Sequence, residues 1–256
     1  MDPATLIGFV ISLGALLTFM ILEGSDPMSL LFLPAIVLVI FATFGAAASS
    51  HTLDDLKKIP AWFKMGALPA KVPAPTEQIQ ILVGLAEKAR KEGLLALEAQ
   101  VKEIDDPFLK RGLQMGIDGT DPEELRAVLE GEIAAKKGED KVAAKFFNAM
   151  GGYAPTIGIV GCIVGLINVM GNLSDPESLG PMIAAAFVAT LWGVMAANFW
   201  FLPMGAKILR VSELQAARME LLVEGITEIQ AGTSPRAVRQ KLTSMVPPSS
   251  LAREAA

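Results

Sequence analysis

Histidine and cysteine are nearly missing from this chain of 256 residues, which holds one of each, His51 and Cys162. A single copy therefore cannot assemble a metal cluster from these side chains, a Cys/His nucleophilic pair or an internal disulfide. A glycine-rich phosphate loop is also missing, because Gly158, Gly161 and Gly165 lie inside an apolar segment, where small residues indicate close helix packing. We therefore expect neither enzyme chemistry nor a cofactor.

Long stretches of the chain also lack basic residues. There is no Lys or Arg before Lys57 and none between Lys145 and Lys207, although 19% of the residues are charged and 52% are hydrophobic. Such segregation of charge is typical of a membrane protein whose basic loops stay on the cytoplasmic side. The net charge of −5 argues against a nucleic-acid partner.

Four apolar stretches fill the zones without basic residues, and they cover about residues 4–22, 28–50, 149–171 and 179–202. Each can cross a hydrocarbon core of about 30 Å, because roughly 20 helical residues suffice. The first stretch has no basic residue ahead of it, so we interpret it as a retained span rather than a cleaved signal peptide. The sequence therefore predicts four transmembrane helices.

The loops between these stretches predict the orientation of the chain. The connections 23–27 and 172–178 carry acidic residues and no basic ones, so we place them outside the cell. The positive-inside rule puts the basic segments and both termini on the cytoplasmic side of the inner membrane. The predicted division is membrane pairs at 1–50 and 149–202, a cytoplasmic domain at 51–148, and a C-terminal helical segment and tail at 203–256.

The cytoplasmic segments are predicted to be helical. A proline-rich connector is expected first, at Pro60, Pro69, Pro73 and Pro75. Thr76 is then a candidate cap for a helix whose apolar residues recur at helical spacing as far as Val101, and Asp121 and Ser234 each precede a proline that can begin a helix. We expect disorder in the tail 247–256. With no strand pattern in the sequence, the predicted fold class is all-α: a polytopic membrane protein with a helical cytoplasmic domain.

Small and polar residues form one stripe on each of the last two spans. The stripes are Pro155, Gly158, Cys162, Gly165 and Val169 on the third span, and Ala186, Thr190, Gly193 and Ala197 on the fourth. One interpretation is a packing seam in which the Thr190 hydroxyl bonds a carbonyl one turn back. The other is an ion path in which Thr156, Cys162 and Thr190 supply weak polar atoms. Spacing alone does not choose between them.

None of the four spans contains an ionisable residue. A protein that conducts ions normally places such a group inside the membrane, at a cost of roughly 2.5–3.5 kcal/mol on insertion scales, because the ion must bind somewhere. If this chain moves ions, the binding carboxylate must therefore belong to a partner.

Five blocks carry a resemblance to a known family. They are residues 89–98, 106–109 with 118–119, 153–158, 184–191 and 232–236. Their sequences, from Ala89-Arg90-Lys91-Glu92-Gly93 to Gly232-Thr233-Ser234-Pro235-Arg236, resemble the successive signature blocks of the MotA/PomA stator family, and the similarity covers nearly the whole chain. The family is all-helical with four spans, in agreement with the hydropathy pattern.

The resemblance implies a role in the bacterial flagellar motor. It implies a homo-pentamer around two copies of a single-span partner of the MotB/PomB type, whose membrane aspartate binds the ion and whose periplasmic domain grips peptidoglycan. Inward ion flow then turns the ring, and the cytoplasmic domain drives a FliG-like rotor switch protein. One charge crossing 100 mV releases about 2.3 kcal/mol, which is several times RT.

Two pairs of residues match functional positions of that family. Pro155 and Pro203 match prolines that couple the ion site to cytoplasmic movement, and each is a candidate bend at an end of its span. Arg90 and Glu98 match a charged pair that meets the rotor; on one continuous helix they would lie about 12 Å apart along the axis and about 80° apart around it. Both pairs also have plain alternatives, as tolerated membrane prolines and as solvated charges in i,i+4 pairs such as Glu98–Lys102.

The transported ion is less clearly indicated. Cys162 occupies a position that is typically threonine in sodium-driven members of the resembled family and alanine in proton-driven ones. A thiol is a poor ligand for a hard cation, so we favour H⁺ over Na⁺. An energiser of envelope transport like ExbB or TolQ is the alternative function, although those proteins usually have three spans and lack the block from Arg90 to Glu98. A secondary transporter would show inverted repeats, and the sequence has none.

Overall fold

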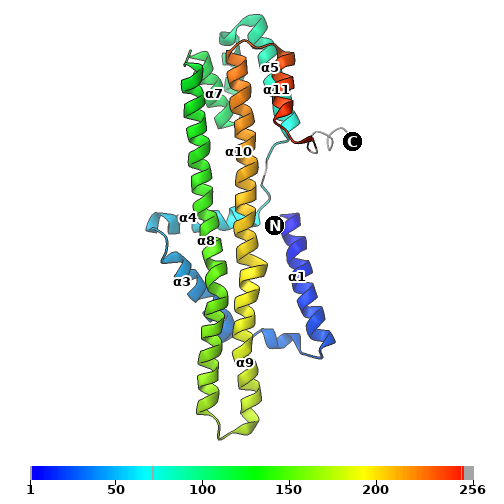
Figure 1. Cartoon of the computed structure of the whole chain (residues 1–256), viewed down its shortest axis with the longest axis vertical. Helices are drawn as coiled ribbons and strands as arrows, with labels where there is room; N and C mark the ends of the chain where they lie inside the picture. The colour runs from blue at the N-terminus through cyan, green and yellow to red at the C-terminus, as the bar shows by residue number, and fades with distance from the viewer. Residues whose placement is uncertain (1, 71, 249, 251–256) are drawn as a thin grey trace. The chain divides into compact units, whose positions relative to one another are not determined.

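The computed structural model describes residues 2–70, 72–248 and 250, and all regular elements in that part of the chain are helical (Figure 1). The first half contains α1 (Pro3–Leu22), the 3₁₀ turn η1 (Pro27–Leu30), α2 (Leu33–Val37), the π-helical η2 (Leu38–Ala42), α3 (Thr43–Ala48), α4 (Leu53–Ala67), α5 (Pro75–Glu92), η3 (Leu94–Leu97), α6 (Glu98–Glu103) and α7 (Pro107–Ile117). The second half contains α8 (Pro122–Gly171), α9 (Pro176–Met195), the π-helical η4 (Ala196–Phe201), α10 (Leu202–Gln230) and α11 (Pro235–Ser244). The predicted all-α class is confirmed.

The chain divides into two compact units, which two long helices both enter. The apolar unit comprises residues 1–70 and 140–210, and the charged unit comprises 71–139 and 211–256. α8 and α10 each have one end in the apolar unit and the other end in the charged unit. The boundaries at 139/140 and 210/211 lie inside these helices, and the third, at 70/71, lies in the connection between α4 and α5.

The apolar unit carries the segments suited to a membrane. Three helical stretches are long and apolar enough to cross one, namely Pro3–Leu22, Pro122–Gly171 and Pro176–Gln230. Large apolar side chains face outward from them, such as Ile11 at 65% and Ile167 at 66% exposure. Such faces are expected where lipid or another protein, rather than water, surrounds a helix.

The predicted second span differs from the observed helix. Expected over 28–50, it begins as the turn η1 and becomes continuous only from Leu33 to Ala48. Phe32 adopts an extended conformation ahead of Pro34, which occupies the first turn of α2. The continuous part is about 24 Å long along its axis, which is shorter than each of the other three apolar helices.

A helix also replaces part of the expected proline-rich connector. Thr52 and Asp55 form a capping box at the start of α4, and Pro60 lies within that helix. The proline removes one backbone hydrogen bond. Packing offsets the loss, because Trp62 lies 5.7 Å from Phe146 between ring centroids on the facing α8. In Figure 1 α4 runs across the direction of α1, near the end of α1 that holds its N-terminus.

The charged unit is a helical bundle around an apolar core. Its most deeply buried side chains include Leu82, Leu97, Leu125, Leu129, Leu222, Ile226 and Leu242. Asp121 and Ser234 accept backbone hydrogen bonds at the starts of α8 and α11, as predicted. The predicted cap Thr76 is wrong: Ala74 is the capping residue, because Pro75 already occupies the first helical position. The predicted disorder of 247–256 falls largely on residues outside those described.

Candidate functional site

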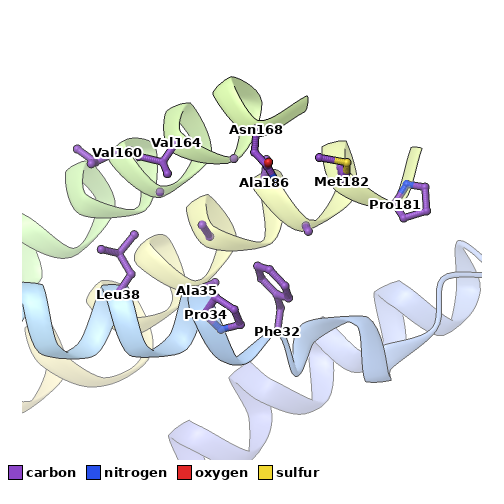
Figure 2. Close-up of a pocket in the computed structure, with 14 residues that line it drawn as sticks. Phe32, Pro34, Ala35, Leu38, Val160, Val164, Asn168, Pro181, Met182 and Ala186 are labelled. Atoms are coloured by element: carbon purple, nitrogen blue, oxygen red, sulfur yellow. The ribbon is translucent and has the colours of Figure 1, made fainter. Parts of the chain in front are cut away.

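The two predicted stripes of small residues face each other along α8 and α9. A methyl group added at Gly158 would lie 2.8 Å from the Ala189 carbonyl oxygen, and one added at Gly193 would lie 2.5 Å from the Ala154 carbonyl oxygen. Towards the other end of α9, a methyl group at Gly165 would come within 2.7 Å of the Ala186 Cβ. Figure 2 shows the two helices side by side near Ala186. Backbones this close require glycine, so the stripes form a packing seam.

The polar atoms of the predicted ion path have different environments. The Thr190 hydroxyl donates to the Gly158 carbonyl on the facing helix at 3.4 Å, instead of to a carbonyl one turn back. Thr156 is exposed and donates to the Tyr153 carbonyl of its own helix at 2.8 Å. Cys162 is half-buried. Of these three residues only Thr190 bonds across the seam, so its hydroxyl is held where the helices touch.

The seam continues through glycines that the sequence pattern did not single out. A methyl group at Gly151 would lie 2.4 Å from Leu202 Cδ2, and one at Gly205 would lie 2.4 Å from the Asn148 amide oxygen. Gly151 lies seven residues before Gly158. That spacing was a usable signal, because residues seven apart lie on nearly the same face of a helix.

The position of Gly205 depends on the π-helical turn η4. Twelve residues separate Gly193 from Gly205, and in a regular α-helix twelve residues would place them about 120° apart. A π-helical turn accommodates one additional residue, which brings Gly205 back to the face of Gly193. Periodicity at 3.6 residues per turn therefore could not find this glycine.

Pro155 and Pro203 are linked through this same contact. Pro155 lies inside α8, where its ring faces the carbonyl of Gly151 one turn earlier, and Gly151 packs on Leu202 beside Pro203. Pro203 is the second residue of α10, which begins where η4 ends. Both sites of missing backbone hydrogen bonds thus meet at one helix crossing, a place where the two helices can adjust with little loss of bonding.

A polar cluster ties three segments together at the end of the apolar unit that holds the N-terminus of α1. Lys207 of α10 contacts Asp2 at 3.3 Å and donates to the Thr5 hydroxyl at 2.9 Å. It also lies 3.5 Å from the Leu68 carbonyl, just past α4. Desolvation raises the pKa of Asp2, but the Lys207 and Thr5 hydrogen bonds outweigh it and lower that pKa. Asp2 therefore stays ionised and caps α1.

Arg90 and Glu98 do not share one helix, which corrects the expected geometry. α5 ends at Glu92, and Gly93 has a φ of 87°, a conformation that favours glycine. Arg90 then lies in the last turn of α5 and Glu98 in the first turn of α6, both exposed. Each charge complements the dipole of its own helix end. Glu98 pairs with Lys102 at 3.2 Å, which is the contact expected if Glu98 is only a solvated charge in an i,i+4 pair.

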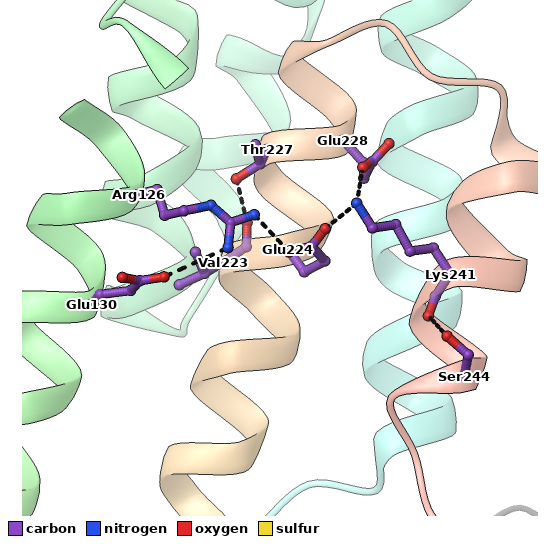
Figure 3. Close-up of polar contacts among 8 residues, drawn as sticks. All are labelled: Arg126, Glu130, Val223, Glu224, Thr227, Glu228, Lys241 and Ser244. Atoms are coloured by element: carbon purple, nitrogen blue, oxygen red, sulfur yellow. Dashed lines mark hydrogen bonds and ion pairs between the residues drawn. The ribbon is translucent and has the colours of Figure 1, made fainter. Parts of the chain in front are cut away.

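An ionic network centred on one buried carboxylate braces the charged unit (Figure 3). Glu224 of α10, 8% exposed, accepts from Arg126 of α8 at 2.6 Å and from Lys241 of α11. Lys241 also contacts Glu228 at 2.5 Å, and Arg126 contacts Glu130 at 3.5 Å. Desolvation raises the pKa of Glu224, but the bonds from Lys241 and Arg126 outweigh it and lower that pKa. No periodic pattern in the sequence predicted this network, because its members come from three separate helices.

Similarity to known proteins covers nearly the whole chain. Residues 100–221 match the profile of the MotA/TolQ/ExbB proton channel family. Motility protein A of Bacillus subtilis (strain 168) is 34% identical over 247 residues, which is 96% of this chain and 92% of that protein. In structure the chain is similar to C. jejuni MotAB, with a TM-score of 0.93, 29% identity and 97% of both chains covered. It is also similar to the flagellar MotAB stator complex of Bacillus subtilis, with a TM-score of 0.91, 33% identity and coverage of 99% and 100%.

Proposed function

Because this chain belongs to the motility protein A family of MotA/TolQ/ExbB proton channel proteins, we propose that it is the ion-conducting ring subunit of a bacterial flagellar stator. The observation that carries this function is similarity to MotAB stator complexes over nearly every residue, in sequence and in fold. The alternative of an ExbB- or TolQ-like energiser is not favoured, because the relatives that match over nearly the full chain include motility proteins.

In this proposal the chain crosses the inner membrane four times. α1, the helix from Leu33 to Ala48, the outer part of α8 and the stretch α9–η4 are the spans. The second span is short, and the apolar turn η1 ahead of it contributes the remaining thickness. Both termini lie in the cytoplasm, on the side of the basic segments.

The partner in this proposal is a single-span protein of the MotB/PomB type. The apolar stretches 4–22, 28–50, 149–171 and 179–202 contain no Asp, Glu, Lys, Arg or His, so in this proposal a partner supplies the ion-binding aspartate. MotA and MotB form one complex in both structural relatives. We place five copies of this chain around two of the partner, with H⁺ favoured over Na⁺ as the transported ion and no cofactor.

The seam between α8 and α9 is the proposed ion-side surface. Cys162 and Thr190 supply polar atoms at the seam, Thr156 supplies one on the exposed side of α8, and Thr190 is positioned by its bond to the Gly158 carbonyl. Pro155 and Pro203 are the proposed coupling residues, since the packing of Gly151 on Leu202 links them. A change of the partner's protonation state at the seam would then reach the cytoplasmic part of α8 and α10.

Arg90 and Glu98 are the proposed contacts to a FliG-like rotor protein. Both lie beside the turn at Gly93, so they flank a corner of the charged unit. Charges at an exposed corner contribute little to stability and are free to set the specificity of a contact.

The decisive experiment is motility of a strain lacking this gene, complemented with wild type, with Arg90→Glu or with Arg239→Glu. We expect the deletion strain to be flagellated but paralysed, wild type to restore swimming and Arg90→Glu to abolish it while the protein level stays normal. Arg239→Glu makes the same change of charge on the exposed face of α11 and should swim. A deletion strain that swims with no other stator gene present would refute the stator function.

A further inference from the structure

The apolar unit contains a cavity of about 650 Å³ between the α2–η2 helix, α8 and α9. Figure 2 shows Leu38 and Val160 at one end of it and Phe32, Asn168 and Met182 at the other. Asn168 is the sole polar side chain among the residues that line it. All three walls come from one copy of the chain, so the cavity does not depend on a partner for its shape.

One end and one wall of the cavity are closed by tight packing. Leu38 closes one end by packing on Gly161, where an added methyl group would lie 2.7 Å from Leu38 Cδ2. The contact of Gly165 with Ala186 forms part of the wall between α8 and α9. At the other end, Asn168 accepts from the Asn172 amide at 3.3 Å. The cavity is therefore apolar along its length and polar at one end.

Water is a poor occupant of such a cavity. A bound water needs about two to four polar partners, and a single carboxamide does not provide them. The cavity lies among helices whose exposed faces are apolar, such as that of Ile167, so the surrounding medium in the membrane is hydrocarbon. An alkyl chain is the occupant that this medium supplies.

We propose that this cavity binds one acyl chain of a membrane phospholipid, with the headgroup at the Asn168 end. From Val160 to Asn168 the wall extends about 12 Å along α8, enough for much of one acyl chain. The headgroup then lies on the side of the acidic loop 172–178, in the leaflet away from the basic segments. A volume of several hundred Å³ is in the usual range for a ligand site.

The lipid site lies on a different face from the proposed ion-side surface. Cys162 lies about 130° around α8 from the middle of the cavity wall, and neither it nor Thr190 lines the cavity. The bound chain would support the seam from behind, at Gly165 and Ala186, without touching the ion. The proposal therefore depends on the membrane location of the chain and not on its motor role.

Photolabelling tests this site in the purified complex of the full chain with its single-span partner. The complex is reconstituted in nanodiscs that contain phosphatidylglycerol with a diazirine in one acyl chain, irradiated, digested and mapped by mass spectrometry. We expect labelling of the peptides that contain Phe32–Leu38 and Val160–Asn168 to exceed that of α1 several-fold, although α1 is more exposed. Equal labelling of α1 and the cavity peptides would overturn the proposal.

A pair of neighbouring substitutions supplies the control. Ala185 lines the cavity and Ala184 does not, so Ala185→Phe should cause a several-fold loss of cavity labelling while Ala184→Phe leaves it unchanged. If Ala185→Phe does not assemble, Val164→Phe, which alters the cavity wall, and Ile163→Phe, which does not, repeat the comparison. A loss of labelling in both members of a pair, or in neither, would contradict the site. So would a photo-crosslinking amino acid at Val164 that captures a second copy of the chain instead of lipid.

Discussion

The two units hold their helices together by opposite means. In the apolar unit α8 and α9 meet through glycine and alanine, with carbonyl oxygens such as that of Ala189 within 3 Å of where a side chain would begin. In the charged unit α8, α10 and α11 are joined by an apolar core and by the ionic network around Glu224. The first arrangement is set by shape and is insensitive to pH, whereas the second is set partly by charge.

The difference follows from the surroundings of each unit. Between helices in lipid there is no hydrophobic driving force, so close backbone approach supplies the attraction and small residues permit it. In water, burial of apolar side chains drives association, and ion pairs at its edge select one arrangement. We therefore expect the apolar unit to be intolerant of added volume, and the charged unit to be sensitive to loss of charge.

The largest effect is expected from added volume in the seam. At Gly158 the neighbouring atoms are backbone, namely the Ala189 carbonyl and the Cα atoms of Thr190 and Gly193, so they cannot rotate away. Gly158→Leu should therefore prevent assembly of the complex, since overpacking costs about 1–3 kcal/mol even where side chains can adjust. Assembly is measured by size-exclusion chromatography of the chain coexpressed with its partner, and function by swimming.

Gly152 is the matched control for that change. It lies on the same helix with nothing within 4 Å of an added methyl group. Gly152→Leu should therefore yield a complex of normal size. If both variants assemble, the seam is looser than its backbone distances imply, and the contrast between the two units weakens.

An intermediate effect is expected from loss of charge at Glu224. Glu224→Gln leaves Arg126 and Lys241 without their shared carboxylate, and a hydrogen bond to a charged group contributes about 1.5–3 kcal/mol. Because both cations are partly exposed, we expect Glu224→Gln to destabilise the docking of α11 by about 1–2 kcal/mol. Amide hydrogen exchange in α11 should then be about tenfold faster than in wild type at pH 7. Glu130→Gln removes an exposed pair and should change that exchange little.

The stabilisation by Glu224 is expected to decrease as the pH falls. The pKa of Glu224 is lowered in the folded chain, so its contribution is present above the unfolded pKa, about 4.3, and is lost as pH falls through the folded pKa. The difference in α11 exchange between wild type and Glu224→Gln should therefore shrink below about pH 4. A difference that persists unchanged at low pH would mean that packing, and not charge, holds α11.

Much of this architecture was predictable, and the errors have physical causes. The span ends near Leu22 and Gly171 and the facing stripes followed from hydropathy and helical spacing, because the spans obey one period. The break at Gly93 was missed because apolar residues keep helical spacing across it, although the glycine adopts a positive φ. Helix α4 was missed because Pro60 suggested a connector, while tertiary packing of Trp62 outweighed that local preference.

The site was predictable where it lies on one helix face and not where it joins helices. Gly158 and Gly193 could be found from spacing, but Gly205 required the π-helical turn η4, which no period of 3.6 residues reveals. The ionic network around Glu224 joins residues as far as 98 positions apart in sequence, a relation that only the tertiary fold creates. The wall formed by Phe32 and Pro34 likewise depends on how α2 lies against α8.

The smallest effect on stability is expected at Cys162, where the seam's chemistry rather than its shape is changed. Threonine is close to cysteine in size, and Cys162 is half-buried, so Cys162→Thr should leave assembly with the partner unchanged. The threonine hydroxyl is a better ligand for a hard cation than the cysteine thiol, so rotation of the motor should become more dependent on sodium. The measurement is the rotation speed of beads on flagellar stumps across sodium concentrations, with Cys162→Ala as the control that lacks a polar atom. If neither variant shifts the sodium dependence, position 162 does not contribute to ion choice, and among the proposed polar atoms the Thr190 hydroxyl, held against Gly158, becomes the next one to test.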